Sequence, residues 1–133
     1  MRKNCLDYEK WFEDADGDLN LAKMGIDSGQ EDVARSAGIC CFNAVEKALK
    51  AVIINRSKKL PEMIHDLGNL FNKLPDEIKQ DLSKEEIKFI SEMTQYFVPL
   101  RYPQENRIDF TMETVAKWHK LSAAIVSKLK SRC

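Results

Sequence analysis

The stretch ARSAGICCFNAVEKALKAVII at residues 34–54 decides the fold. Its apolar and small side chains recur at steps of three and four residues and cover more than half of a helical circumference, which predicts a helix buried on several sides. A narrow polar stripe interrupts this surface. Its members are spaced i, i+3, i+4 and i+7, so they project from one face. They are Asn43, Glu46, Lys47 and Lys50.

The same periodicity continues along the chain, and no alternating strand pattern interrupts it. Five helices are expected, over residues 8–26, 31 or 32 to 55, 62–74, 83–98 and 111–130. At 133 residues the chain fits one domain, which we expect to span residues 1–133. The predicted fold class is therefore all-α, an up-and-down helical bundle of four long helices plus one short helix.

Proline and capping residues set the predicted boundaries in the second half of the chain. Pro75 stops the short helix, and Ser83 with Glu86 has the S-x-x-E form of a capping box that opens the fourth helix. Pro99 kinks or ends that helix, which leaves residues 100–110 as an irregular segment. The inward positions of the fourth helix are expected to be Ile87, Ile90, Thr94 and Phe97.

The bulk composition excludes several classes of protein. Lys plus Arg equal Asp plus Glu at 21 each, so the chain has no excess charge that would attract nucleic acid or a membrane surface. The cysteines form no C-x-x-C pair and no Cys/His cluster, so no metal and no cofactor is expected, and reduced thiols fit a cytoplasmic protein. The longest apolar run, residues 51–54, is too short to span a membrane.

Three segments taken together resemble the HEPN family of helical domains, which is named for proposed nucleotide binding. CFNAVEKALK at residues 41–50 resembles the family's second helix with its Glu-Lys-x-x-Lys core. IHDL at residues 64–67 resembles the His-Asp-Leu opening of a short helix, and YFVPLRYP at residues 96–103 is similar to the tyrosine and Arg-Tyr-Pro that follow the fourth helix. The resemblance implies a prokaryotic-type bundle that commonly pairs as a homodimer and often acts beside a minimal nucleotidyltransferase.

Some HEPN members are toxins that cut RNA, and those carry an Arg-x(4–6)-His motif near the fourth helix. This sequence departs from that pattern, because the histidine that follows Arg101 is His119, 18 positions further on. RNA cleavage without a metal needs an imidazole placed near the phosphate and the 2′-hydroxyl. The resemblance therefore implies the non-nucleolytic branch that contains Arg-Tyr-Pro, and no catalytic residue is assigned.

Seven residues are candidates for binding an anionic ligand. They are Asn43, Glu46, Lys47, Lys50, His65, Arg101 and Tyr102. Arg101 supplies a planar cation suited to a two-pronged phosphate contact, and Tyr102 supplies a ring on which a base can stack. The structural alternative is that Arg101 pairs with an acidic side chain while Tyr102 packs at the end of the bundle.

The polar stripe has three interpretations that the sequence leaves open. Lys47 and Lys50 can neutralise a phosphate while Glu46 and Asn43 orient them. Alternatively, Glu46 pairs with Lys50 at i, i+4 as an ordinary surface contact, or the stripe lies at a dimer interface. His65 can contact an anion near the start of the short helix, or serve as a structural hydrogen-bonding group.

Three functional hypotheses follow from these residues. The first is a HEPN-type nucleotide-binding or accessory module without catalysis of its own, which partners a minimal nucleotidyltransferase. The second is an RNA-cleaving toxin with a non-standard site, using His65 or His119 with Arg101 or Arg107. The third is a purely structural or partner-binding dimeric bundle.

Overall fold

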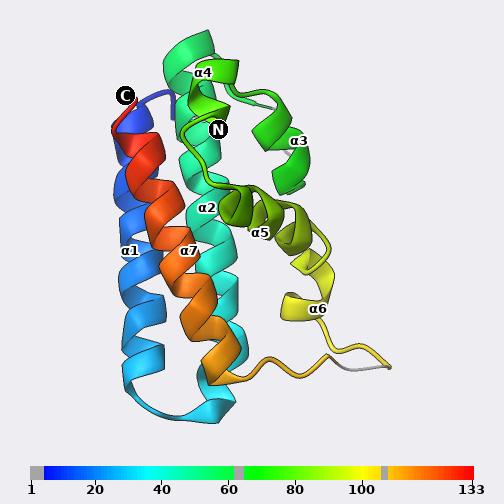
Figure 1. The fold of residues 1–133 in the computed structure, drawn as a ribbon. Helices are drawn as coiled ribbons and strands as arrows, with labels where there is room; N and C mark the ends of the chain where they lie inside the picture. Colours follow the sequence, from blue (N-terminus) through cyan, green and yellow to red (C-terminus); the bar gives the residue numbers. More distant parts are fainter. Residues whose placement is uncertain (1–4, 62–64, 106–107) are drawn as a thin grey trace, which may run out of the picture.

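The computed structural model describes residues 5–61, 65–105 and 108–133, and within them the chain is helical with no strand. The elements are α1 Tyr8–Asp27, η1 Glu31–Val33, α2 Ala34–Ser57, α3 Leu67–Asn72, α4 Asp76–Lys79, α5 Lys84–Thr94, α6 Phe97–Arg101 and α7 Met112–Lys130. Helices α1, α2 and α7 run side by side along the length of the molecule (Figure 1). The predicted all-α up-and-down bundle is confirmed.

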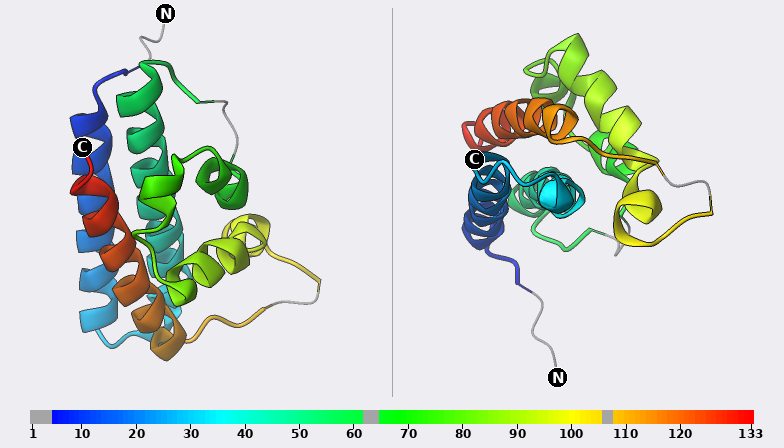
Figure 2. Two further views of the ribbon diagram at one scale, coloured as in Figure 1. Left: turned by 45° about the horizontal axis from the view of Figure 1, so that its top comes forward. Right: turned by 90° about the horizontal axis from the view of Figure 1, so that it is seen from below.

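Helix α2 occupies the centre of the molecule, as its sequence predicts. It packs against α1 and α7 on one side and against α3 and α6 on the other, an arrangement that is clear when the bundle is seen from below (Figure 2). Phe42, Val45, Leu49 and Val52 are fully buried in the core that these helices share. Burying each such side chain stabilises the fold by about 1.5–3 kcal/mol. No helix within the described ranges is long and apolar enough to cross a membrane.

The predicted start of the central helix is only partly right. Residues 31–33 form the 3₁₀ turn η1, and α2 begins at Ala34. The carboxylate of Glu31 instead accepts a hydrogen bond from the backbone N–H of Met112, at 2.9 Å, and so satisfies one of the open donors at the start of α7. Helix α2 continues to Ser57, and Lys58 in the left-handed conformation ends it.

The short helix α3 is shorter than predicted. The prediction covered residues 62–74, of which 62–64 lie outside the described residues, and the helix is observed only from Leu67 to Asn72. Asp66 is its N-cap, because the side chain accepts the N–H of Asn69 at 3.0 Å. His65 therefore precedes the helix and does not belong to its first turn.

The capping box of Ser83 and Glu86 is confirmed, with both of its hydrogen bonds present. The break after this helix was predicted at the wrong residue. Helix α5 ends at Thr94, and Pro99 lies in the first turn of α6, where a backbone N–H has no intrahelical acceptor and proline costs little. The irregular segment consequently begins at Tyr102 and not at residue 100.

The inward face of α5 also differs from the prediction. Of the four expected positions Ile90 is buried, whereas Ile87, Thr94 and Phe97 are only partly buried. The positions buried beside Ile90 are Glu86, Phe89 and Met93. This face is rotated by about one residue from the predicted one and includes Glu86, whose Oε1 atom accepts a hydrogen bond from Lys128 of α7 at 2.7 Å.

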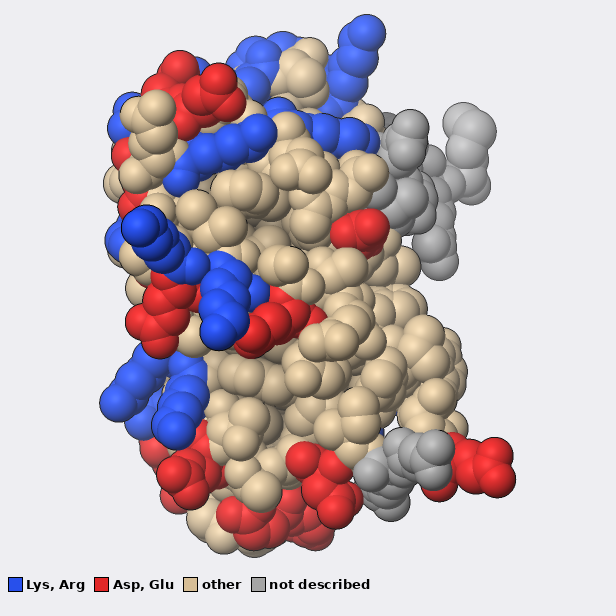
Figure 3. Space-filling model, turned by 45° about the vertical axis from the view of Figure 1, so that its right-hand side comes forward, with Lys and Arg blue, Asp and Glu red and all other residues tan. Residues whose placement is uncertain are grey.

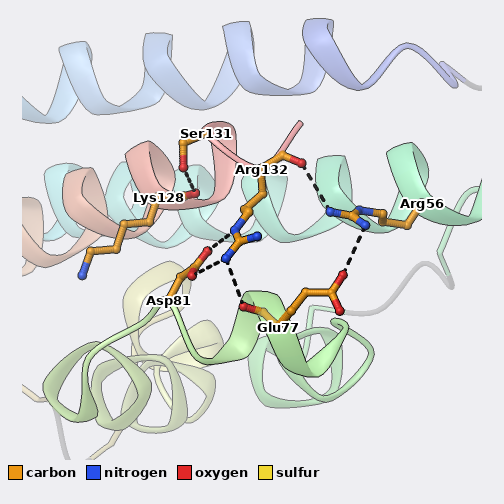
Figure 4. Close-up of polar contacts among 6 residues, drawn as sticks. All are labelled: Arg56, Glu77, Asp81, Lys128, Ser131 and Arg132. Atoms are coloured by element: carbon orange, nitrogen blue, oxygen red, sulfur yellow. Dashed lines mark hydrogen bonds and ion pairs between the residues drawn. The ribbon is translucent and has the colours of Figure 1, made fainter.

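Two arginines form hydrogen bonds that connect α4 and the residues before α5 to the three long helices. Arg132 donates two N–H groups to the carboxylate of Asp81, and Arg56 donates to Glu77 of α4 at 3.5 Å (Figure 4). These bonds fix the corner between α4 and α5, and hydrogen bonding to Arg132 lowers the pKa of Asp81.

Arg35 of α2 makes a second kind of connection. It donates to the carbonyl groups of Pro99 and Ile108, the latter at 2.8 Å, and its guanidinium lies 5.0 Å from the centre of the Phe110 ring. It therefore joins α6 to the segment that enters α7.

The core between α2 and α7 contains a polar pair, Cys41 and Ser122, whose burial is unfavourable. Burial raises the pKa of Cys41 to about 12, and the Ser122 hydroxyl lies close enough to that thiol to oppose the shift. This hydroxyl is fully buried, and it makes no well-aligned hydrogen bond to any described residue. Cys41 is buried and acts as a small core residue, whereas Cys40 is only half-buried.

Candidate functional site

The polar stripe of α2 divides between two sides of the helix. Lys47 turns toward α1, where its Nζ atom lies 2.8 Å from Asp18. Asn43 and Glu46 instead contact residues that come from α6 and from the segment before α3. The four polar residues therefore contact two separate sets of partners and do not present one continuous surface to a ligand.

The pair formed by Glu46 and Lys50 is buried, which corrects the expectation of an ordinary surface contact. Glu46 Oε2 lies 3.2 Å from Lys50 Nζ, and only 5% of the lysine side chain and 12% of the glutamate side chain are exposed. Burying an ammonium group is costly unless a counter-ion accompanies it. Glu46 Oε1 is used as well, because it lies 2.9 Å from His65 Nδ1.

Arg101 is held by neutral partners rather than by the acidic side chain of the structural alternative. Its Nη2 donates to Asn43 Oδ1 at 2.6 Å, and its Nη1 donates to the carbonyl of Phe97 at 3.1 Å. The guanidinium carbon lies 4.0 Å from the centre of the Phe97 ring and 4.9 Å from that of Phe42. Desolvation lowers the pKa of Arg101, and the charge of the nearby Glu46 opposes this shift.

The ring of Phe97 links the arginine to the histidine. His65 stacks on Phe97, with ring centroids 4.5 Å apart and planes inclined by 12°. Phe97 was predicted only as a core residue, and Phe42 and Asp18 were likewise not recognised as neighbours of the candidate residues. The spacing of Phe97 and Arg101 at i, i+4 was the available signal, since residues so spaced on a helix are neighbours.

The structure thus brings five of the seven candidates into one connected group, which we call the Arg101 cluster. Its members are Asn43, Glu46, Lys50, His65 and Arg101. Lys47 lies on the α1 side, and Tyr102 lies at the end of α6 with 57% of its surface exposed. An exposed ring beside a fixed guanidinium is compatible with stacking on a base.

His119, named in the nuclease hypothesis, does not join this cluster. His119 Nε2 lies 3.0 Å from the carbonyl of Leu19, so it connects α7 with α1. Helix α1 lies on the opposite side of α2 from α6 (Figure 2). Arg107 lies outside the described residues.

The Arg101 cluster has two chemical capacities. The guanidinium is a fixed, planar cation whose contacts are an amide oxygen, a carbonyl oxygen and two aromatic rings, so it can bind an anion directly. His65 has one ring nitrogen beside a carboxylate while about half of its side chain is exposed, so its ring is held in place and stays accessible to solvent. No group of three or more metal-ligating side chains occurs in the part of the chain that the structure describes.

These features define a small all-α bundle domain with a partly buried arginine and histidine beside its central helix. The HEPN domain family matches residues 8–132. The chain therefore belongs to the HEPN family, which confirms the resemblance seen in its three segments.

Two crystal structures share this fold. The protein TT1696 from Thermus thermophilus is 19% identical with a TM-score of 0.81, over 97% of this chain and 100% of that one. ST0689, an archaeal HEPN homologue, is also 19% identical with a TM-score of 0.66, over 99% of this chain and 98% of its own. At such identity the likeness shows the fold alone. Among curated proteins, no sequence matches the chain.

Proposed function

We propose that this HEPN-family chain is a nucleotide-binding or accessory module without catalysis of its own. It acts in the cytoplasm as a homodimer beside a minimal nucleotidyltransferase. The observation that carries the ligand-binding part is the environment of Arg101, whose guanidinium is fixed in position by hydrogen-bond partners that, within the described residues, include no carboxylate. A fixed cation without a directly bonded carboxylate is suited to a phosphate group.

The contacts of the cluster indicate how a phosphate is bound. A guanidinium has five N–H donors, and the hydrogen bonds to Asn43 and Phe97 engage only part of this set. Lys50 and Lys47 are already paired with Glu46 and Asp18, so their charges are compensated locally and they do not contact the phosphate directly. Among the residues that the structure describes, the site therefore offers one direct cation, with the His65 imidazole and the Tyr102 ring as further contacts.

Isothermal titration calorimetry with AMP and ATP tests the ligand-binding part. We expect binding by the wild-type protein and a loss of at least about tenfold for Arg101→Ala, as removal of a charge-assisted contact implies. Tyr102→Ala, at an exposed position, should weaken nucleotide binding but not the binding of inorganic phosphate. Lys120→Ala, exposed on α7, is the control. Failure of the wild type to bind any of these ligands defeats this part of the proposal.

The accessory role needs separate experiments. Light scattering reports whether the chain forms a homodimer, and co-purification with a minimal nucleotidyltransferase encoded in the adjacent reading frame reports the partner. A dimer whose interface covers Asn43 and Lys47, combined with no nucleotide binding, would favour the purely structural bundle.

RNA cleavage remains a second candidate function because of one contact. The carboxylate of Glu46 lies 2.9 Å from His65 Nδ1, and a carboxylate placed in this way orients an imidazole for proton transfer. A gel assay with purified protein and His65→Ala decides between the two functions. Cleavage that disappears in the variant would replace the binding proposal, whereas the proposal expects intact RNA with both proteins.

A further inference from the structure

A polar pocket of about 350 Å³ lies between α3 and α5, next to the Arg101 cluster along the chain. It is lined by Asp66, Gly68, Asn69, Asn72, Ser91 and Thr94. The surface over α3 and α6 is almost uncharged, while Lys and Arg gather toward one end of this face and Asp and Glu toward the other (Figure 3). Within the described residues the lining contains no cation and no large apolar side chain, so it suits neither an isolated anion nor an apolar ligand.

Hydrogen bonds hold the walls of this pocket in place. Thr94 Oγ1 accepts the backbone N–H of Gly68 at 3.0 Å and donates to the carbonyl of Ile90 at 3.1 Å, which joins α3 to α5. Asp66 Oδ1 accepts the N–H of Asn69 at 3.0 Å. The backbone that forms the pocket is therefore fixed from both helices before any ligand arrives.

Other polar atoms of the lining remain available. Asp66 Oδ2, the side-chain amides of Asn69 and Asn72, and the hydroxyl of Ser91 make no hydrogen bond to another described residue. Together they present a carboxylate acceptor, two groups that both donate and accept, and a hydroxyl. A neutral ligand with neighbouring hydroxyl groups matches this set, and a carboxylate is a common acceptor for the hydroxyls of a ribose.

The pocket is linked to the proposed phosphate site by residues that neighbour each other in the chain. Asp66 follows His65 directly, so their Cα atoms are separated by about 3.8 Å. On the other wall, Thr94 precedes by three residues the Phe97 ring that contacts both His65 and Arg101. A ligand that reaches from the cluster into the pocket needs a phosphate at one end and a sugar next to it.

We propose that the α3–α5 pocket binds the ribose hydroxyls of a ribonucleoside monophosphate whose phosphate lies at Arg101 and His65, an inference that rests on the proposed function. A single phosphate fits a site that offers one direct cation. The pocket makes the site selective for ribonucleotides over deoxyribonucleotides, because a ligand without the 2′-hydroxyl loses one hydrogen bond to the polar lining.

Calorimetry with AMP and 2′-deoxy-AMP tests this selectivity, because the two ligands have the same charge, phosphate and base. We expect the wild type to bind AMP about five- to tenfold more tightly than 2′-deoxy-AMP, as one net hydrogen bond provides. The double variant Asn72→Ala/Ser91→Ala should reduce this preference, because it removes two of the polar groups that can bind a ribose hydroxyl. The matched control Asn20→Ala/Ser127→Ala, which removes the same groups from exposed positions on α1 and α7, should keep the wild-type ratio.

The outcomes separate this inference from the proposed function. Equal wild-type affinity for the two nucleotides, or an unchanged ratio in the Asn72→Ala/Ser91→Ala variant, overturns the pocket assignment and leaves phosphate binding at Arg101 standing. Failure of the wild type to bind either nucleotide overturns both. Arg101→Ala should weaken both ligands by the same factor, since the ribose contacts do not involve the guanidinium.

Discussion

Glu46 holds the buried ammonium group of Lys50 through its Oε2 atom, at 3.2 Å, in the middle of the central helix. The second oxygen of this carboxylate lies 2.9 Å from the imidazole of His65, outside that helix. The i, i+4 pair on α2 is therefore a part of the interior that also positions a candidate site residue.

Removing Glu46 should destabilise the fold strongly. Glu46→Ala leaves Lys50 buried without its counter-ion, and breaking such a pair costs about 3–5 kcal/mol. Urea unfolding measures the loss. Lys50→Met in the Glu46→Ala background should recover part of this stability, because the uncompensated charge is then gone. A loss below about 1 kcal/mol for Glu46→Ala would show that water reaches the ammonium group.

The stacking of Arg101 on Phe97 should appear as an energetic coupling between the two side chains. In a double-mutant cycle of Arg101→Gln and Phe97→Leu we expect a coupling of about 1 kcal/mol, as cation–π contacts of partly buried side chains provide. Chemical denaturation of the four proteins gives this value. Additive effects of the two substitutions would contradict the contact.

Acid should destabilise the protein partly through Glu86. Burial raises the pKa of this carboxyl, but hydrogen bonds from Lys128 and from Ser83 lower it by a larger amount. The net shift of the pKa is therefore downward. A folded-state pKa below the unfolded value means that the stabilisation is present above the unfolded pKa and is lost as the pH falls through the folded pKa. Unfolding midpoints measured from neutral pH down to about pH 3 should therefore fall, and they should fall less steeply in Glu86→Gln.

The acid experiment has a matched control. Glu92→Gln alters an exposed carboxylate on the same helix, whose partner Lys88 is 3.8 Å away and mostly exposed. Its unfolding midpoints should follow those of the wild type. A Glu86→Gln profile with the wild-type slope would assign the acid sensitivity to other carboxyls.

Ser122→Ala should leave the stability unchanged or raise it by up to about 1 kcal/mol, because it removes a buried hydroxyl that makes no well-aligned hydrogen bond. Thermal unfolding measures this change, and Ser127→Ala, at an exposed position of the same helix, controls for the serine substitution itself. A clear loss of stability in Ser122→Ala would indicate that the hydroxyl bonds effectively to the Cys41 thiol.

Helices and caps that depend only on residues close together in the chain can be predicted from the sequence. The central helix follows from the periodicity of residues 34–54, and the capping box follows from Ser83 and Glu86, whose partners are three residues apart. The break before Pro99 was misplaced because proline is tolerated in a first turn, and the sequence does not show where that turn begins.

The candidate site depends on contacts that no local pattern contains. Spacing along α2 places Asn43 and Lys47 on one face, but only the packing of α1 and α6 decides that Lys47 meets Asp18 while Asn43 meets Arg101. These partners are separated by 29 and 58 residues, respectively. Residue types alone therefore identified the candidates without identifying which of them belong together.

The hydrogen bonds made by Arg35 determine how well this fold tolerates extra residues between α6 and α7. The Arg35 side chain of α2 donates to the carbonyl of Pro99 in α6 and to that of Ile108 ahead of α7. These two hydrogen bonds hold the ends of the intervening connection together. Each doubling of the length of such a closed loop costs only roughly 0.6 kcal/mol of chain entropy. Extra residues in the later part of this connection should therefore leave the guanidinium of Arg101, which Asn43 holds, in its place.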